Sequence, residues 1–195
     1  MPAGRPRSFD REQALDRALK VFWRKGFEGT SLPDLTKAMR INRPSLYAAF
    51  GNKEALFLKA IERYEATNAC HVLEALDERN VRTAVEKLLA SNVEMITDPR
   101  NPQGCFMVQG ALACGDSADP VKCEMEKRRA GFEALLRKRF ARAVSEGELP
   151  KDAKPADLAR FVATLSNGIA VQAAGGATRG QLMRVVKVAM GAWPG

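Results

Sequence analysis

Residues 30–50, TSLPDLTKAMRINRPSLYAAF, decide how this chain folds. They predict two short helices, because Ser31 and Asn42 are favourable helix N-caps and a proline in the first turn after each removes no helical hydrogen bond. Asp34, three residues after Ser31, can complete a capping box. Residues 40–42 leave room only for a tight turn between the two helices.

The second of these helices has two different faces. Leu46 and Phe50 lie four residues apart and should point into the protein. The outward face is then basic, polar and aromatic, and consists of Arg43, Ser45, Tyr47 and Ala48. Such a pair of helices is typical of the helix-turn-helix motif, whose second helix enters the major groove of DNA. An ordinary helical hairpin in a bundle is the alternative.

The composition favours a protein that binds a polyanion. The chain has 195 residues and a net charge of +8, and 46% of its residues are hydrophobic, which excludes a largely disordered chain. Residues 1–52 contain ten Lys or Arg and only five Asp or Glu. A basic segment of this kind attracts nucleic acid, although a solvated basic face has the same composition.

The sequence contains no recognisable catalytic, metal or membrane segment. His71 is the one histidine, and no nucleophile elbow, phosphate loop or metal-ligand spacing occurs, so we expect neither an enzyme nor a metal or cofactor. No apolar run reaches the roughly 20 residues of a membrane span, and the basic N-terminus is not followed by a signal-peptide core. We therefore expect a cytoplasmic protein without a membrane partner, whose four cysteines are free thiols.

The neighbouring segments carry a family resemblance. Residues 10–25 predict a first helix with an aromatic stripe, and Asn52 caps a long fourth helix that runs to about Glu78. The motifs occur in the order Gly26-Phe27, Thr30-Ser31, Ser45-Leu46-Tyr47-Ala48-Ala49-Phe50 and Asn52-Lys53-Glu54-Ala55-Leu56-Phe57. Over residues 9 to about 64 the chain resembles the tetracycline-repressor (TetR/AcrR) family. Arg43-Pro44 stands where a Lys-Gly pair is frequent in that family, so no base preference is carried over.

The resemblance implies an all-α protein of about nine helices. Residues 1–52 would form a three-helix, homeodomain-like DNA-binding domain, and residues 53–195 a helical effector-binding and dimerisation domain. The implied function is a sequence-specific transcriptional regulator, a repressor that a small apolar ligand of unknown identity releases from a pseudo-palindromic operator on double-stranded DNA. Two alternatives stay open: a repressor that senses oxidants or electrophiles through Cys105, and a DNA-binding protein without an inducer.

Outward geometry and family position agree on a set of DNA contacts. Arg43 can form hydrogen bonds with guanine edges, and Pro44 and Ala48 can make apolar contact with a thymine methyl group. Together with Ser45 and Tyr47 these residues should meet the major groove. Thr30 or Ser31, Tyr47 and Lys53 are the expected phosphate contacts, which set the register of the protein without reading sequence.

The rest of the chain predicts five more helices. Their expected limits are Val81–Thr97, Cys105–Cys114, Asp119 to about Glu146, Pro155 to about Ala174, and a last helix that Thr178 caps and that reaches Trp193. The last two helices are expected to form a two-fold dimer interface. The expected surface consists of Ala163, Gly168, Ala170, Ala173, Ala174, Met183, Val186, Met190 and Trp193. Use of the same residues in the core of one subunit is the alternative.

A ligand pocket is expected in the middle of the chain, where Met and aromatic residues occur with a few amides. The candidates are Tyr64, Asn68, His71, Met95, Cys105, Phe106, Gln109, Cys114, Met125, Phe132, Phe161 and Asn167. Packing of the same residues in the hydrophobic core is the alternative interpretation. Cys105 follows Gly104 at the start of a predicted helix, where backbone N–H groups would lower the pKa of its thiol.

Overall fold

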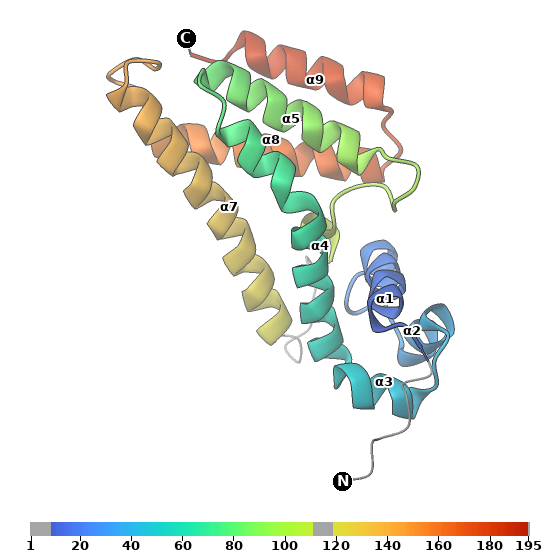
Figure 1. Ribbon diagram of the computed structural model, residues 1–195. Coiled ribbons are helices and arrows are strands. Elements are labelled where there is room, and N and C mark those ends of the chain that lie inside the picture. The colour runs from blue at the N-terminus through green and yellow to red at the C-terminus, as the bar shows by residue number, and fades with distance from the viewer. Residues whose placement is uncertain (1–8, 111–118, 195) are drawn as a thin grey trace.

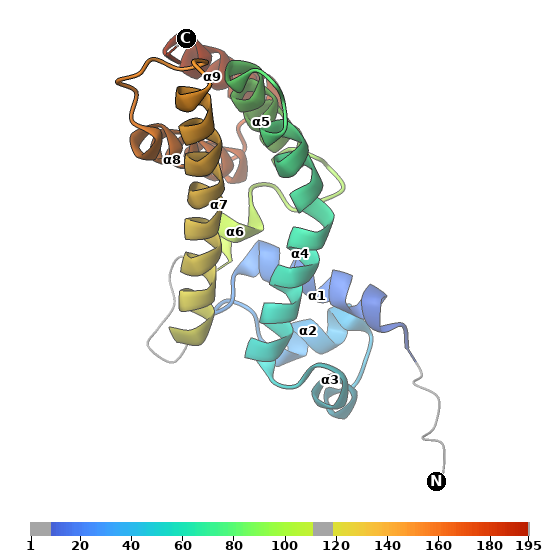
Figure 2. The ribbon, with the colours of Figure 1, turned by 60° about the vertical axis from the view of Figure 1, so that its left-hand side comes forward.

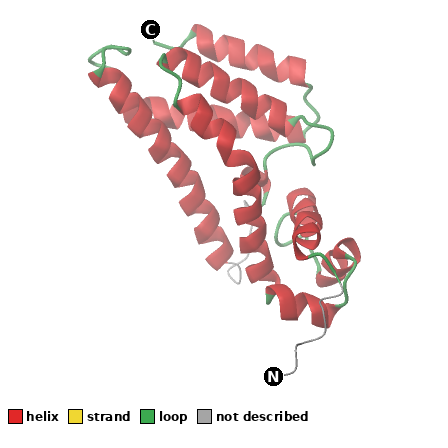
Figure 3. Ribbon diagram, in the orientation of Figure 1, coloured by secondary structure: helices red, strands yellow, loops and turns green. Residues whose placement is uncertain are grey.

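The computed structural model describes residues 9–110 and 119–194, apart from the side chains of residues 68, 69 and 119. Within these ranges the chain forms nine helices and no strand, so the predicted all-α class is confirmed (Figure 3). Three short helices lie at one end of the molecule and a packed group of helices at the other, and two long helices run between them (Figure 1). The predicted Cys114 lies outside the described residues.

The N-terminal end contains α1 (Arg11–Lys25), α2 (Leu32–Met39) and α3 (Arg43–Phe50). The predicted capping box forms, since the Ser31 hydroxyl accepts from the Asp34 N–H while the Asp34 carboxylate accepts from the Ser31 N–H. Asn42 caps α3 by accepting from the N–H of Ser45 at 2.8 Å. These local bonds place a turn of a few residues between α2 and α3, as the sequence predicted.

Helix α4 (Lys53–Leu76) belongs to both ends of the molecule. Its first half packs against α1, and Phe57 contacts Phe22 edge-on with ring centroids 5.0 Å apart. The same core includes Phe106 and Met125, which come from much later in the chain. A division of the chain at residue 52, which stays a prediction, therefore separates helices but does not separate hydrophobic cores.

The remaining helices are α5 (Val81–Ile96), α6 (Phe106–Gln109), α7 (Asp119–Ser145), α8 (Pro155–Ala174) and α9 (Arg179–Gly191). Helices α5, α8 and α9 pack together at the far end, and α6 lies between α7 and the N-terminal helices (Figure 2). The sixth helix was expected to extend from Cys105 to Cys114, but its described part is a single turn because Gly110 follows Gln109 as its C-cap. The last helix ends two residues before Trp193, which packs against Phe140.

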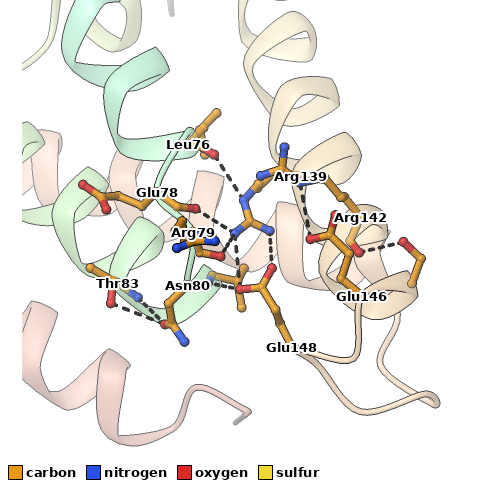
Figure 4. Close-up of polar contacts among 11 residues, drawn as sticks. Leu76, Glu78, Arg79, Asn80, Thr83, Arg139, Arg142, Glu146 and Glu148 are labelled. Carbon is orange, nitrogen blue, oxygen red and sulfur yellow. Dashed lines mark hydrogen bonds and ion pairs between the residues drawn. The ribbon is translucent and has the colours of Figure 1, made fainter.

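A buried arginine fixes the far end of α4. Arg139 of α7 donates to the main-chain carbonyls of Leu76, Glu78 and Arg79 and forms an ion pair with Glu148 (Figure 4). The Arg139 side chain is only 3% exposed. Because the last carbonyls of a helix have no partner within it, one guanidinium here completes the C-terminal end of α4 and joins it to α7.

Most of the residues that were expected to form the dimer surface are buried within the subunit. Ala163, Ala170 and Ala173 of α8 are buried within the subunit, and so are Val186, Met190 and Trp193 at the end of the chain. These side chains serve the core of one subunit, which was the alternative interpretation. Of the other expected residues, Gly168 and Ala174 are exposed and Met183 is half-buried. The exposed large apolar residues of the same two helices are Phe161, Val171, Val185 and Val188. The periodicity indicated a buried face correctly but could not say which subunit buries it.

Candidate nucleic-acid interface and the cleft behind it

Helix α3 presents a packed face and an exposed face. Leu46 and Phe50 are buried, whereas Arg43, Pro44, Tyr47 and Ala48 are exposed and Ser45 is half-buried. The helix contains no acidic residue. The outward set predicted from the sequence therefore lies together on one surface, and this surface offers a cation, a hydroxyl, a phenol and two small apolar groups. These are the groups that contact base edges and phosphates in DNA complexes.

Arg43 and Tyr47 are in contact with each other. The Arg43 guanidinium donates to the Tyr47 hydroxyl at 3.5 Å and lies 5.8 Å from the centroid of its ring. The sequence had assigned base readout to Arg43 and phosphate contact to Tyr47 as separate tasks. The structure brings the two side chains into one unit, so a change at Tyr47 also changes the position of Arg43.

The hydroxyl groups before α2 are used inside the protein. Thr30 is 1% exposed, and its Oγ1 donates to the carbonyl oxygen of Gly26 at 2.6 Å. Ser31 is exposed, but its hydroxyl donates to Asp34 at 2.8 Å as part of the capping box. Both residues were expected as phosphate contacts. Burial removes the Thr30 hydroxyl from any such contact, and the Asp34 carboxylate gives the start of α2 a negative charge.

Lys53 lies in the first turn of α4, where a cation opposes the helix dipole. From the sequence, we expected Lys53 at this position to contact a phosphate of DNA. In the structure the Lys53 ammonium lies 4.3 Å from the centroid of the Phe27 ring. The attraction between a cation and a ring face offsets part of the unfavourable dipole interaction. A contact within the protein therefore holds the Lys53 ammonium against Phe27, in the loop after α1.

A cleft of about 860 Å³ lies behind the three N-terminal helices. One wall belongs to α1, and the other walls come from α4, α5, the segment before α6 and the start of α9. The lining residues are Asp16, Leu19, Lys20, Trp23, Thr67, His71, Glu94, Met95, Thr97, Asp98, Pro99, Arg100, Asn101 and Arg179. Two of the predicted ligand residues, His71 and Met95, are among them, and the other candidates whose side chains the structure describes are not.

Charged groups dominate the rim of this cleft. Asp16 pairs with Arg63 at 2.7 Å, Glu94 pairs with Arg179, and Asp98 pairs with Arg100 at 2.7 Å. The Arg100 guanidinium holds the pKa of Asp98 at about 2. Lys20 forms no ion pair with any described residue, and its ammonium donates to the carbonyl oxygen of Arg100 at 3.2 Å. The cleft therefore differs from the apolar pocket that the sequence predicted.

Four of the predicted ligand residues, Tyr64, Cys105, Phe106 and Met125, pack in or against the core instead. Tyr64, Phe106 and Met125 are buried, and Trp23 stacks edge-on against Tyr64 at 5.0 Å. The Tyr64 hydroxyl lies 3.3 Å from Cys105 Sγ. Burial raises the pKa of the Cys105 thiol above its usual value, despite the bonds from Tyr64 and two backbone N–H groups. The lowered pKa expected at this helix start is wrong, because removal from water outweighs a single helical turn.

The last predicted ligand residues do not gather around one site. Phe161 and Asn167 are exposed on α8, and Phe132 packs partly against the core of the far end. The Gln109 side chain lies beside Gly104, and its Oε1 is buried without a hydrogen-bond partner. The side chain of Asn68 lies outside the description. Sequence reasoning missed Lys20, Arg100 and Arg179 as cleft residues, since nothing local links these three distant cations.

Two negative findings hold for the described residues. No helix in residues 9–110 or 119–194 is long and apolar enough to cross a membrane. In the same ranges no group of three or more His, Cys, Asp or Glu side chains is arranged to hold a metal ion.

Comparison with known proteins assigns the family. Residues 14–60 match the model of the bacterial regulatory proteins, tetR family, and residues 81–187 match the tetracyclin repressor-like C-terminal domain. The HTH-type transcriptional repressor ComR of Escherichia coli (strain K12) is 33% identical over 193 residues, which cover 98% of this chain and 92% of that protein.

Solved structures agree with the sequence comparison. A double cysteine mutant of the TetR family transcriptional regulator CifR, complexed with 26bp double-strand operator DNA, is 40% identical with a TM-score of 0.94, and the match covers 97% of this chain and all of that one. A putative TetR transcriptional regulator from Rhodococcus sp. RHA1 is 37% identical with a TM-score of 0.64, over 95% of this chain and 99% of that one. The resemblance carried by the helix-turn-helix residues is thus confirmed across both halves, and the chain belongs to the TetR family of bacterial transcriptional regulators.

Proposed function

We propose that this protein is a dimeric transcriptional repressor that binds a pseudo-palindromic operator through α3 of each subunit. The exposed face of α3 carries this proposal. In this proposal Arg43 and Ser45 reach base edges, Pro44 and Ala48 contact thymine methyl groups, and Tyr47 and Lys53 contact phosphates, which the exposure of Arg43, Pro44, Tyr47 and Ala48 supports. A regulator with one recognition helix per subunit gains specificity from two half-sites about one helical turn apart.

The dimer is proposed to form through the outer faces of α8 and α9. Phe161 and Val171 of α8 and Val185 and Val188 of α9 are large apolar residues left exposed by the subunit fold, and Val188 is 75% exposed. Exposed large apolar residues on two adjoining helices are typical of a surface that another subunit covers. Two helices from each subunit would then form a four-helix interface.

DNA recognition is tested by selecting a consensus from random duplexes of about 30 base pairs, roughly three helical turns. Fluorescence anisotropy then measures the dissociation constant of the wild type and of each variant on this duplex and on single-base changes of it. Arg43→Ala should weaken binding about 10-fold or more and flatten the preference at one base pair, since a bidentate base contact contributes about 1–3 kcal/mol. Arg137→Ala, an exposed arginine on α7, is the control with the same loss of charge. Unchanged affinity and preference in Arg43→Ala would contradict direct readout by α3.

The effector is proposed to bind in the cleft between α1 and the rest of the molecule. Leu19, Trp23 and Met95 offer apolar side chains, and the Lys20 ammonium offers a cation that forms no ion pair with a described residue, although its charge helps to lower the pKa of the nearby Asp98. This combination suits a small organic acid with an apolar body. Because one wall is α1, a ligand in the cleft favours one position of the DNA-binding helices over another, and it releases DNA only by its difference in affinity for the two positions.

Trp23 provides the readout, because the chain has only two tryptophans and Trp193 can be replaced. Trp193→Phe protein is titrated with benzoate and with the neutral analogue benzamide while Trp23 emission is followed. We expect benzoate to change the emission at lower concentration than benzamide, and Lys20→Met to abolish this difference. Equal responses to both compounds before the Lys20 change would exclude an anion site in the cleft. The same compounds added to the DNA complex test release.

A further inference from the structure

Arg40 has a backbone conformation that arginine rarely adopts. It ends α2 with φ 58° and ψ 42°, and among the residues the structure describes it is the one non-glycine residue with positive φ. In this left-handed region the β-carbon of an L-residue approaches the following carbonyl oxygen, so glycine and asparagine are the favoured residues. The backbone conformation therefore does not explain why this residue is an arginine.

The conformation itself is required by the turn. The N–H groups of Arg40 and Ile41 both donate to the carbonyl oxygen of Thr36, which ends α2 within one residue and lets Asn42 cap α3. A glycine would make the same two bonds without the steric cost. The side chain at this position must therefore contribute something else, or the position is merely tolerated.

The Arg40 guanidinium makes no polar contact within the described part of the chain. It is exposed, and no ion pair or side-chain hydrogen bond joins it to any described residue. Three nearby cations behave differently: Arg17 donates to Gln13 at 2.6 Å, Lys25 pairs with Asp34 at 2.8 Å, and Arg43 packs on Tyr47. Lys37 of α2 is exposed and, like Arg40, has no ion pair or side-chain hydrogen bond with a described residue, but its backbone is helical. Arg40 is thus a cation without a polar partner among the residues that the structure describes.

Its position determines what it can reach. Arg40 stands two residues before the N-cap of α3 and three before Arg43, at the end of α3 that enters the major groove in a helix-turn-helix complex. The edge of the groove at that end is a row of phosphates. We propose that Arg40 binds a DNA phosphate beside the N-terminal end of α3, so that a strained backbone position is kept for a contact made only in the complex. The proposal rests on the DNA-binding function proposed above.

The test separates the effect of the backbone conformation at residue 40 from the effect of its side-chain charge. Arg40→Gly and Arg40→Asn remove the charge and relieve the left-handed conformation, and Arg40→Lys keeps both the charge and the conformation. We expect the first two to melt at or above the wild-type temperature, yet to bind the selected duplex about 3- to 10-fold more weakly. The slope of log K against log salt concentration should fall by about 0.9, the value for one phosphate contact. Arg40→Lys should keep the wild-type slope.

Three results would overturn the proposal: a wild-type salt slope in Arg40→Gly, a lower melting temperature in both Arg40→Gly and Arg40→Asn, or an equal loss of affinity in Arg40→Lys. Arg137→Ala again controls for overall charge and should leave the slope unchanged. Failure of this inference differs from failure of the proposed function. In the first case the wild type binds and Arg43→Ala weakens it while Arg40→Gly does not, and in the second no wild-type consensus is selected.

Discussion

The indole N–H of Trp23 donates a 3.1 Å hydrogen bond to the main-chain carbonyl of Gly104. This bond joins α1 to the segment that leads into α6. Two further donors from the same part of the chain reach the backbone on either side of α6. The Lys20 ammonium donates to the Arg100 carbonyl before α6, and the Phe27 N–H donates to the carbonyl of Gly110, the C-cap of α6, at 2.8 Å. The DNA-binding helices are therefore attached to the rest of the molecule through the backbone of residues 97–110 as well as through α4.

Loss of the hydrogen bond from Trp23 to Gly104 should lower the free energy of unfolding and weaken the attachment of α1 to the segment before α6. Trp23→Phe keeps most of the buried ring but leaves the Gly104 carbonyl without its donor, at an expected cost of about 1–3 kcal/mol. Urea denaturation followed by circular dichroism measures this cost. Trp193→Phe is the matched control, because the Trp193 N–H has no hydrogen-bond partner in the structure. An equal loss in both variants would assign the effect to ring size.

Gly104 should not tolerate a side chain. Its φ is +87°, and an added β-carbon would lie 2.6 Å from Oε1 of Gln109 and 3.0 Å from the β-carbon of Ala174. Gly104→Ala should therefore lower the free energy of unfolding by about 1–3 kcal/mol. Gly131→Ala, in the middle of α7 with nothing near the new atom, should instead raise it by about 0.5–1 kcal/mol. Thermal melts of the two variants are expected to move in opposite directions, and a shift of both in the same direction would contradict this account.

The Arg139–Glu148 pair should make stability depend on pH. Burial by itself raises the pKa of Glu148, but bonds from Arg139 and from the Val81 N–H outweigh it, and the pKa of the folded protein lies below the usual value. A carboxylate with a lowered pKa stabilises the fold above its unfolded pKa and loses that contribution as the pH falls through the folded pKa.

Glu148→Gln should therefore be less stable than the wild type near pH 7, by about 3–5 kcal/mol, because Arg139 is left buried without its partner. The difference should shrink as the pH falls from the unfolded pKa of about 4.3 toward 3. Urea denaturation at a series of pH values measures it. A difference between the two proteins that does not vary with pH would show that Glu148 does not act through its charge.

A charge on the outer face of α9 should prevent dimerisation without unfolding the subunit. Val188 is exposed in the subunit, so Val188→Glu should leave the helical circular dichroism unchanged while it raises the dimer dissociation constant at least about 100-fold, or 2.7 kcal/mol. Leu73→Glu is the control, since Leu73 is 56% exposed on α4. Sedimentation velocity should show a monomer for the first variant and a dimer for the second. A wild type that is monomeric at micromolar concentration would contradict the proposed interface.

The sequence by itself determined the helices and where they begin. The N-caps predicted at Ser31, Asn42, Asn52 and Thr178 all form, and each accepts from an N–H three residues ahead. A cap can be predicted because its partners lie within one turn of the chain. The buried face of α3 could also be predicted, since two apolar residues four apart define it without reference to the rest of the fold.

Only the tertiary structure decided which polar and apolar groups meet. Tyr64 and Cys105 come together from positions 41 residues apart, and their burial reverses the expected direction of the pKa of Cys105. The cleft brings Lys20, Arg100 and Arg179 to one rim from three separate elements. Periodicity states that a face is apolar but not what covers it, and spacing along the chain says nothing of distance once helices pack. What covers an apolar face and how far apart two residues lie both follow from solvent exclusion and long-range contacts, and these depend on the whole fold.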